Sequence, residues 1–426
     1  MIDKYIMKGG DSNHVINKYM PITINLQLAI KSIFDVPYDI KLNTNIDYPK
    51  FSSGFIHYYH SLQKDMEVLK QFENKKKVYN ILNEFDYTID NYDNTIENSC
   101  KKYLNIKDKI PQIINNNFYK LWEIMYMFDL FDINKSITTL HVEDDGGFLQ
   151  SLILFRDKYS KANDKYFAVK SEKNSSIITN LASSYTNKGI KVIDDKNIKD
   201  EFDLIITNVD IKVELYETLE QEYYKTLFKN IMAAIRTQKR EGVFICKFYD
   251  TYTLTSIKFI LILMSLYEKV FFSKPLTSKL SDPEKYIICI NFKYQSSDKR
   301  FQEILKGLEK LYSQAESSKL NIVDLFSSYE INSDVLIRIL QMNVVCGNNY
   351  FKHNGDIVSF INSQNYYGDK YQEYREKQIE GTEYWTKLFL PETKDYNTTK
   401  NKIKEISFLS NKINTDMAVK LEKTLI

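Results

Sequence analysis

The sequence contains few of the residues that interrupt or cross-link a chain. Only 12 glycines and 7 prolines occur in 426 residues, which argues against a long disordered polypeptide. The four cysteines, Cys100, Cys246, Cys289 and Cys346, lie far apart and form no CxxC pair. The five histidines do not group with them at the spacing of a zinc site. We therefore expect a reducing compartment and no structural metal.

Long apolar runs are also missing. The longest one, Phe259–Leu266, is far shorter than the roughly 20 residues that cross a bilayer. Residues 1–12 lack the basic segment and the following apolar run of a signal peptide. The sequence predicts a soluble, cytoplasmic protein that has no membrane partner.

No charge of one sign dominates the chain. The 58 basic and 56 acidic residues give a formal charge of +2, so any nucleic-acid binding must come from a local patch. Apolar residues make up 43% of the chain and aromatic residues 14%, which allows a sizeable core. Because the chain exceeds what a single core usually serves, we expect one main domain with helical additions, or two to three domains.

The middle of the chain alternates short apolar runs with amphipathic segments, a pattern typical of a mostly parallel sheet with connecting helices. Seven strands are predicted, at Thr139–Glu143, Tyr166–Ser171, Lys191–Asp194, Asp203–Asn208, Gly242–Phe248, Lys269–Ser273 and Lys285–Phe292. Helices are predicted near Gly147–Tyr159, Ser175–Asn187, Val213–Thr237 and Thr253–Tyr267. No helix separates the last two strands, which indicates a doubly wound sheet that ends in an antiparallel hairpin.

Both flanks show helical spacing instead. In the N-terminal flank apolar residues recur at this spacing from His57 to about Leu104. The C-terminal helices are predicted at Phe301–Gln314, Val335–Val345 and Asp369–Leu388. We divide the chain into a helical N-terminal region (1–115), an α/β domain (116–297) and a helical C-terminal region (298–426).

An acidic loop, Glu143–Phe148, joins the first predicted strand to a helix and contains Gly146 and Gly147. Glycines let a ligand approach the backbone, and a helix N-terminus presents free N–H groups. Three carboxylates would repel a phosphate, but they would attract the sulfonium and α-amino group of S-adenosylmethionine. The loop therefore favours that cofactor over NAD. A tight strand-to-helix turn without a ligand is the alternative.

Two lysines and one basic loop complete the candidate chemistry. Lys247 ends the predicted strand 242–248, and ligands bind at the carboxyl edge of such sheets. Lys120 lies in an apolar helix, and residues 273–288 form a basic, hydroxyl-rich loop that leads through Glu284 into the last strand. The alternatives are a snorkelling Lys120, a solvent-exposed Lys247 that caps its strand, and a solvated loop.

In this order, these stretches resemble the FtsJ-like RNA 2′-O-methyltransferases, most closely the branch of large cytoplasmic DNA viruses. The segment from Lys120 to Ile124 is similar to the family's Lys-Leu-x-Glu-Ile helix. The loop from Asp145 to Phe148 is similar to its Pro-Gly-Gly-aromatic loop, and Lys274 to Tyr286 to its Lys-Pro-x-x-Ser-Arg-x-x-x-x-Glu-x-Tyr segment. The resemblance implies a methyltransferase-type doubly wound seven-stranded sheet with helical N- and C-terminal extensions.

The resemblance also implies a Lys-Asp-Lys-Glu tetrad, of which Lys120, Lys247 and Glu284 match three members. Asn208 stands where the aspartate is expected, and Asp210 follows two residues later. The alternative is that a local bulge brings Asp210 into the site in place of Asn208. Lys247 would be the general base, with a pKa lowered by burial and by the charge of Lys120. Glu284 and Asn208 would orient the two lysines by hydrogen bonds.

The implied cofactor is S-adenosylmethionine and the implied partner is RNA, in particular capped mRNA, with other capping or transcription proteins as further partners. The cofactor residues implied are Glu143, Asp145, Gly146, Gly147 and Phe148, with Asp194 or Asp195 near the adenosine. The substrate residues are Lys274, Ser278 and Lys279. Asp145 replaces the family's proline and Lys279 its arginine. A viral protein of this kind would act in the host cytoplasm or in the virion.

Three functions remain to be distinguished. The first is methyl transfer to a ribose 2′-hydroxyl near the mRNA cap. The second, favoured by Asn208 and Asp145, is a catalytically inactive methyltransferase-fold subunit that binds RNA or capping partners. The third, an NAD-dependent dehydrogenase, lacks a G-x-G-x-x-G loop. A binding titration with S-adenosylmethionine separates these hypotheses best.

Overall fold

The structure is a computed structural model. It describes residues 21–49, 56–57, 61–62, 64–106, 112–171, 174–194, 198, 200–211, 218–392, 396–398, 400–401 and 403. Of the expected site residues, Asp195 lies outside this set, as does the start of the helix predicted from Val213.

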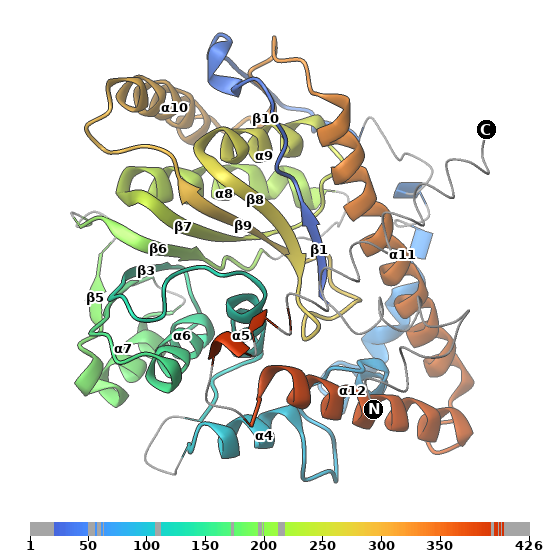
Figure 1. The fold of residues 1–426 in the computed structure, drawn as a ribbon. Coiled ribbons are helices and arrows are strands. Elements are labelled where there is room, and N and C mark those ends of the chain that lie inside the picture. Colours follow the sequence, from blue (N-terminus) through green and yellow to red (C-terminus); the bar gives the residue numbers. More distant parts are fainter. Residues whose placement is uncertain are drawn as a thin grey trace.

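Eight strands form the central sheet, in the order β1-β8-β9-β7-β6-β3-β4-β5 (Figure 1). They are β1 (Ile22–Asn25), β3 (Thr138–Val142), β4 (Lys165–Val169), β5 (Lys191–Ile193), β6 (Phe202–Thr207), β7 (Gln238–Phe248), β8 (Tyr267–Lys274) and β9 (Lys285–Phe292). Strands β3 to β7 pair in parallel, and β9 and β8 follow as an antiparallel hairpin beside β7. The predicted α/β class, with all seven predicted strands and the closing hairpin, is confirmed.

The eighth strand was not predicted, because it comes from the N-terminal region. Strand β1 pairs antiparallel with β8, with Ile22 opposite Lys274. A separate antiparallel pair joins β2 (Ile40–Asn43) to β10 (Asn321–Leu325). The two flanking regions are therefore not purely helical. The three unpredicted strands are only partly buried, so their sequences lack the dense apolar run that marks most of the predicted ones.

The helical parts of the flanks differ in kind. The described N-terminal helices are mostly short 3-10 segments, namely η1 (Ile33–Asp35), η2 (Met66–Phe72) and η3 (Val78–Leu82), followed by α4 (Ile96–Tyr103). The C-terminal helices overlap the predicted ones, as α10 (Lys299–Ser317), α11 (Ser333–Ser363) and α12 (Asp369–Phe389). Helix α11 continues to Ser363, well past its predicted end at Val345. Within the described residues, no helix combines the length and the apolar character that a membrane span needs.

Helices cover both faces of the sheet (Figure 1). The helices that pack on one face are α5 (Asn117–Met127), α6 (Gly147–Tyr159) and α7 (Ser175–Ser184), and those on the other face are α8 (Leu219–Thr237), α9 (Leu254–Leu266) and α10. Side chains of β7 alternate between these two cores: Val243 and Ile245 join the α5 side, and Phe244 and Cys246 join the α8 side. By this alternation Lys247 belongs to the α5 side.

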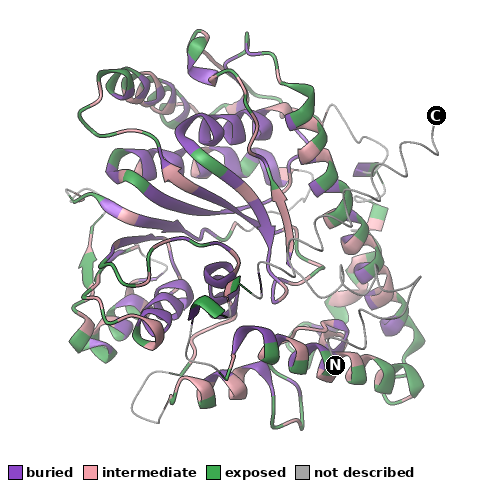
Figure 2. Ribbon diagram, in the orientation of Figure 1, coloured by how far each residue is buried: buried purple, intermediate pink, exposed green. Residues whose placement is uncertain are grey.

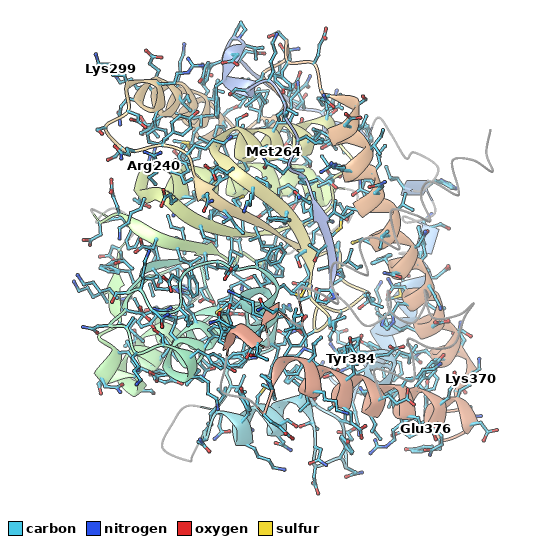
Figure 3. The ribbon with its side chains drawn as sticks, viewed as in Figure 1. Arg240, Met264, Lys299, Lys370, Glu376 and Tyr384 are labelled. Atoms are coloured by element: carbon cyan, nitrogen blue, oxygen red, sulfur yellow. The ribbon has the colours of Figure 1, made fainter. Side chains whose placement is uncertain are left out.

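The C-terminal helix α12 closes the core on the α5 side, and Figure 2 shows that its buried positions face the rest of the molecule. Trp385 and Phe389 are fully buried there. The Trp122 indole donates a hydrogen bond to the Phe389 carbonyl at 2.9 Å. Lys370 and Glu376 lie on the exposed side of the same helix (Figure 3). The apolar stripe of α12 thus belongs to a core that also holds α5.

Candidate active site

Three of the four expected catalytic residues meet at the carboxyl edge of the sheet. Lys120 comes from α5, Lys247 ends β7, and Glu284 immediately precedes β9. Glu284 Oε1 lies 2.5 Å from Lys120 Nζ, and Glu284 Oε2 lies 3.0 Å from Lys247 Nζ. The three side chains are only 4%, 3% and 8% exposed, for Lys120, Lys247 and Glu284 respectively. One buried carboxylate therefore joins two buried ammonium groups.

The strand register explains this arrangement. In the antiparallel pair of β7 and β9, Lys247 lies opposite Tyr286 and Phe248 opposite Lys285, which leaves Glu284 next to the end of β7. From the helix side, Asn117 lies one turn before Lys120 and accepts a hydrogen bond from its Nζ at 2.9 Å. Asn117 was not predicted as a site residue, because an asparagine in the first turn of a helix has no distinctive sequence signal.

The charges of the cluster shift the pKa values of its members. Burial alone would raise the pKa of Glu284, but the charges of Lys120, Lys247 and Lys274 outweigh it and hold this pKa well below its usual range. Burial would lower the pKa of Lys247, yet neighbouring groups, first Tyr286 and then the Glu284 and Asp210 carboxylates, raise it.

The expected lowering of the Lys247 pKa by Lys120 was therefore wrong. Glu284 lies between the two lysines and bonds to both, so it screens one ammonium from the other. Because two carboxylates contact Lys247 directly, its charged form is stabilised. In the free protein Lys247 is an ammonium at neutral pH.

Asn208 and Asp210 are the two candidates for the fourth tetrad position, and they lie in different surroundings. Asn208 lies just beyond β6 and is 2% exposed, but neither its Oδ1 nor its Nδ2 has a hydrogen-bond partner among the described residues. Asp210 instead forms a short ion pair with Lys247. The structure thus brings Asp210 to Lys247, while the side chain of Asn208 makes no described contact with either lysine.

The carboxylates of the acidic loop bond to the backbone N–H groups at the N-terminus of helix α6. Asp144 is 1% exposed and accepts hydrogen bonds from the backbone N–H groups of Gly146, Phe148 and Leu149 at 3.1, 3.3 and 2.7 Å. Asp145 accepts one from Gly147 at 3.2 Å. The N–H groups expected to be free for a ligand are thus already bonded, as the unsatisfied first turn of a helix requires. A phosphate at this helix end would meet two carboxylates.

The two glycines of this loop pack against the protein itself. Gly146 has φ +88°, and a Cβ there would lie 2.9 Å from Ile177 and 3.1 Å from Ile114. A Cβ on Gly147 would lie 2.1 Å from Asn115 Oδ1. The lack of a side chain at both positions therefore allows the loop to pack closely against Ile114, Asn115 and Ile177.

The other expected cofactor residues lie along the same sheet edge. Glu143 adopts φ +53° and forms an ion pair with Lys229 of α8 at 3.2 Å. Asp145 accepts a hydrogen bond from Asn117 Nδ2 at 2.7 Å, and burial together with Asp144 raises its pKa. Asp194 is exposed directly after β5. Asn117 therefore connects the acidic loop to the Lys120 end of the charge cluster.

The basic loop is more internal than expected. Lys274 is 4% exposed and donates hydrogen bonds to the carbonyls of Asp282 and Glu284 at 2.7 and 2.8 Å. Ser278 Oγ donates to Glu284 Oε1 at 2.7 Å. These two expected substrate residues thus hold the loop and its glutamate in place. Lys279 is only partly buried and is the one of the three that reaches the surface.

A buried carboxylate on α5 fastens this loop. Glu123 is fully buried and accepts hydrogen bonds from the backbone N–H groups of Leu276 and Thr277 at 2.6 and 3.0 Å. The Trp385 indole of α12 donates to the same carboxylate at 3.0 Å. Burial raises the pKa of Glu123, and these hydrogen bonds oppose the rise. Glu123 belongs to the motif recognised in the sequence, whereas no sequence signal identified Trp385 on α12 as its partner.

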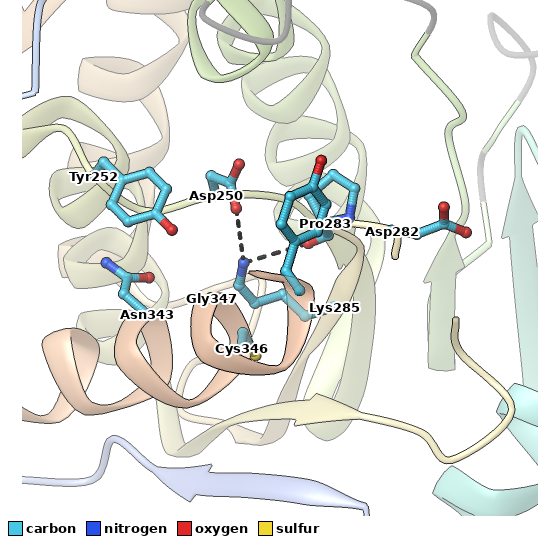
Figure 4. A pocket seen from close by; sticks show the side chains of 9 residues that line it. Asp250, Tyr252, Asp282, Pro283, Lys285, Asn343, Cys346 and Gly347 are labelled. Atoms are coloured by element: carbon cyan, nitrogen blue, oxygen red, sulfur yellow. Dashed lines mark hydrogen bonds and ion pairs between the residues drawn. The ribbon is translucent and has the colours of Figure 1, made fainter. Parts of the chain in front are cut away.

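A small cavity lies beside the loop, between the segment after β7 and helix α11 (Figure 4). Lys285 Nζ lies in its wall, 3.6 Å from Asp250 Oδ1 and 3.4 Å from the Pro283 carbonyl. Its volume is about 10 Å³, about enough for one water molecule. Helix α11 therefore fills this side of the loop, and the cavity does not hold a cofactor or a nucleotide.

Comparison with known proteins shows what the middle of the chain resembles. Residues 113–292 match the model of the FtsJ-like methyltransferase family. The middle of the chain is thus similar to FtsJ-like methyltransferases, and it is also similar at low identity to cap-specific mRNA 2′-O-methyltransferases.

Two of these relatives show how far the likeness extends. Cap-specific mRNA (nucleoside-2'-O-)-methyltransferase 2 of Drosophila melanogaster is 26% identical over 128 residues, which are 30% of this chain and 17% of that protein. Cap-specific mRNA (nucleoside-2'-O-)-methyltransferase 1 of Homo sapiens is 31% identical over 86 residues, 20% of this chain and 10% of that protein. The chain thus matches less than a fifth of the length of these relatives.

Among solved structures, human methyltransferase-like protein 13 in complex with SAH is 15% identical. The match covers 47% of this chain and 93% of that one, with a TM-score of 0.26. At that score the likeness carries no argument about the site.

Proposed function

We propose that this protein transfers a methyl group from S-adenosylmethionine to a ribose 2′-hydroxyl of RNA near the mRNA cap. The observation that carries the proposal is the buried cluster of Lys120, Glu284 and Lys247 at the carboxyl edge of the sheet. The match to the FtsJ-like model and to cap-specific relatives supports the reaction and the substrate class. A place in the viral branch of this family stays a prediction from sequence.

The sheet edge fits a cationic methyl donor. The carboxylates of Asp144 and Asp145 occupy the N-terminus of α6, where a phosphate-bearing cofactor would otherwise bind. Asn208 offers a buried carboxamide whose two polar atoms have no partner within the described part of the chain, and a bound polar group would satisfy them. We propose that Glu143, Asp145 and the residues up to Phe148 hold the donor, with Asp194 or Asp195 near its adenosine.

S-adenosylmethionine supplies an electrophilic methyl group when bound. A ribose hydroxyl is a weak nucleophile, so it must be positioned in line and lose a proton to a base. Lys247 is the proposed base, because Glu284 and Asp210 fix its Nζ from two sides. Its proton must leave first, and Lys247 loses that proton more easily when a further positive charge is held nearby. Lys120 keeps Glu284 ionised and in place.

The RNA side of the site is the loop that ends in Glu284. Lys279 is its surface cation, and Lys274 and Ser278 keep the loop in shape. We propose capped mRNA as the substrate and other capping or transcription proteins as further partners.

A second candidate is a catalytically inactive subunit that binds RNA or capping partners. The observation that favours it is Asn208 at the position of the tetrad aspartate. The ion pair of Asp210 with Lys247 weighs against it, because a decayed site has no need to restore the missing carboxylate.

The first test is calorimetric titration with S-adenosylmethionine and S-adenosylhomocysteine, followed by transfer of labelled methyl groups to capped and uncapped RNA. We expect cofactor binding and cap-dependent labelling. Lys247→Ala should lower the rate by about 10²–10⁴-fold and leave cofactor affinity within a few-fold.

The matched control is Lys258→Ala, because Lys258 is also a buried lysine in an ion pair, at 2.5 Å from Asp324 on the other side of the sheet. It should leave the rate per folded molecule unchanged. No heat and no thermal shift at millimolar cofactor would reject both catalysis and cofactor use. Binding without transfer would favour the inactive subunit.

A further inference from the structure

The carboxamide of Asn208 is built to receive a ligand. Asn208 continues the face of β6 that carries Leu204 and Ile206, by the two-residue alternation of a strand. Its backbone N–H points to the Val142 carbonyl at 3.4 Å, which puts it beside the acidic loop. A buried carboxamide without partners is unfavourable in the folded protein. Asn230 and Asn354 share this state among the described residues, but they lie on helices α8 and α11. Asn208 instead follows a strand at the carboxyl edge of the sheet, where ligands bind, so its donor and acceptor point to a polar group that binds there.

Asp210 is held in its position by a dedicated contact. The Tyr249 hydroxyl donates a hydrogen bond to the Val209 carbonyl at 3.1 Å and accepts one from the Ile211 N–H at 3.3 Å. One phenol thus fixes the peptide groups on both sides of Asp210. Tyr249 itself follows Lys247 by two residues and is 6% exposed. The segment after β6 is therefore shaped so that an otherwise exposed carboxylate, 67% accessible, reaches Lys247.

We propose that this chain divides between two residues the work that a single tetrad aspartate would do: Asp210, positioned by Tyr249, pairs with Lys247, and Asn208 binds the amino-acid end of the methyl donor. The inference rests on the proposed function and goes beyond it, because it gives Asn208 a binding role instead of a place in the charge cluster.

The amino-acid end is the part of the donor that fits Asn208 best. It carries an ammonium group and a carboxylate, and a carboxamide can accept from one and donate to the other. The N–H groups of α6 are bonded to Asp144 and Asp145, so they do not serve the carboxylate. Asp145 in the acidic loop that follows Val142 offers the ammonium a charge partner. The adenosine end carries no group of either charge.

The binding half is tested with two ligands and two variants. S-adenosylhomocysteine carries the amino-acid end, and 5′-methylthioadenosine lacks it. Asn208→Leu should weaken the affinity for S-adenosylhomocysteine about 10- to 100-fold, as expected for lost hydrogen bonds to charged groups. The affinity for 5′-methylthioadenosine should stay within two-fold. Asn354→Leu is the control, since Asn354 on α11 is also fully buried with both carboxamide atoms unpartnered among the described residues.

The outcomes of this titration are distinct. An equal loss of affinity for both ligands in Asn208→Leu would mean a general distortion of the pocket. No loss of affinity for either ligand would mean that Asn208 does not bind the donor. Each of these results overturns the binding role of Asn208. If the unaltered protein binds neither ligand, the proposed function fails first. Should Asn208→Leu not fold, Asn208→Ser, which shortens the side chain, gives the same comparison.

The positioning half is tested on Lys247 directly. In Asp210→Asn one carboxylate disappears, so the pKa of Lys247 falls and more of its amine is neutral at a given pH. Competitive acylation at several pH values, followed by peptide mass spectrometry, should show the Lys247 midpoint moving to lower pH. In an active enzyme the acidic limb of the rate profile moves in the same direction. S-adenosylhomocysteine affinity should stay within two-fold.

Tyr249→Phe should produce a smaller shift in the same direction, because Asp210 remains but its backbone is released. Its control is Tyr329→Phe, whose hydroxyl bonds to the Lys31 carbonyl at 2.7 Å far from the site along the chain. A purely structural role of Tyr249 would change the melting temperature without moving the Lys247 midpoint. An unmoved midpoint in Asp210→Asn would overturn this half of the proposal.

Discussion

At the scale of single residues, the site is a balance of buried charges. Two ammonium groups and one carboxylate are almost completely removed from water, and each is costly to bury without the others. Glu284 is the member shared by both pairs. Removal of Glu284 leaves two buried lysines with a like charge and fewer partners, so the cluster depends on this residue more than on either lysine.

We expect Glu284→Gln to lower the free energy of unfolding by about 3–5 kcal/mol at pH 7, the range for breaking one partner out of a buried ion pair. Urea unfolding at pH 7 measures this difference. Glu309→Gln is a control, because Glu309 pairs with Arg236 at 3.2 Å with both side chains more than 40% exposed, and such surface pairs contribute little. Equal stabilities of the two variants would contradict the balance described.

The same variant has a pH signature. The pKa of Glu284 is depressed in the folded state, so its contribution is fully present above the unfolded carboxyl pKa of about 4.3. That contribution is lost as the pH falls through the lower folded value. The pKa of Lys247 is raised, so its contribution is present below about 10.4 and is lost only as the pH rises further. The gap in unfolding free energy between wild type and Glu284→Gln should therefore be constant down to about pH 4.3 and narrow as the pH falls from there toward the folded pKa.

The residues of this cluster differ in how far the sequence predicted them. Lys120, Lys247 and Glu284 came from motif positions. The structure does not test their catalytic roles, but it brings the three together. The sequence left Asp210 as the alternative to Asn208 and could not decide between them, because the alternation of β6 ends at Thr207 and the path of the next residues depends on the distant hydroxyl of Tyr249.

At the scale of elements, the loop between β8 and β9 is fixed from two helices. Glu123 on α5 accepts from Leu276 and Thr277, and Trp385 on α12 donates to the same carboxylate. The end of this loop carries Glu284. A change on α12 should therefore reach the charge cluster through Glu123, although Trp385 itself touches none of the expected catalytic residues in the described contacts.

We expect Trp385→Phe to destabilise the protein by about 1.5–3 kcal/mol, the range for a hydrogen bond to a charged group. It should also speed hydrogen exchange at the amides of Leu276 and Thr277, because Glu123 loses a partner and holds them less firmly. The control is Trp122→Phe, which removes the other tryptophan of the chain and its bond to the Phe389 carbonyl. Similar exchange of the loop amides in both variants would show that Trp385 acts only through stability.

Elements were predicted well where one physical signal dominated. Strands β3, β4, β6, β7, β8 and β9 are mostly buried and apolar, and the C-terminal helices show a clear helical period, so both were found. Strand β5 was found although two of its three residues are exposed. Strands β1, β2 and β10 escaped detection because they are only partly buried and lie in flanks whose other residues recur at helical spacing. The 3-10 segments of the N-terminal flank were read as α-helix because spacings of three and of 3.6 residues are hard to separate over one or two turns.

At the scale of the whole molecule, hydrogen bonds and strand pairs cross the boundaries of the three predicted regions. Strand β1 of the N-terminal region extends the sheet at β8. Tyr396 Oη donates to the Met125 carbonyl at 3.1 Å, and Trp385 and Phe389 share the core of α5. A sequence pattern shows which face of a segment is apolar, but not which distant segment covers it. The division at 116 and 297 therefore stays a prediction of sequence regions. It does not imply that each region folds independently.

This packing leads to an expectation for the predicted α/β region in isolation. A fragment of residues 116–297 loses Trp385 and Phe389 from above α5, and each fully buried aromatic contributes about 1.5–3 kcal/mol. It also exposes the edge of β8 that β1 covers and leaves the buried Glu123 with one partner fewer. Because whole domains are stable by only about 5–15 kcal/mol, we expect no cooperative unfolding transition from the fragment.

Urea unfolding followed by near-ultraviolet circular dichroism measures whether the fragment unfolds cooperatively. A chain of residues 1–403 is the control, because it keeps every described contact. The control should unfold in one sharp transition. The fragment should show a broad, shallow change, and addition of a separate 298–403 segment should restore part of the signal if the helices bind where they do in the intact chain. A sharp transition from 116–297 alone would mean that the sheet and its helices suffice, and that the flanking regions are additions to a finished core.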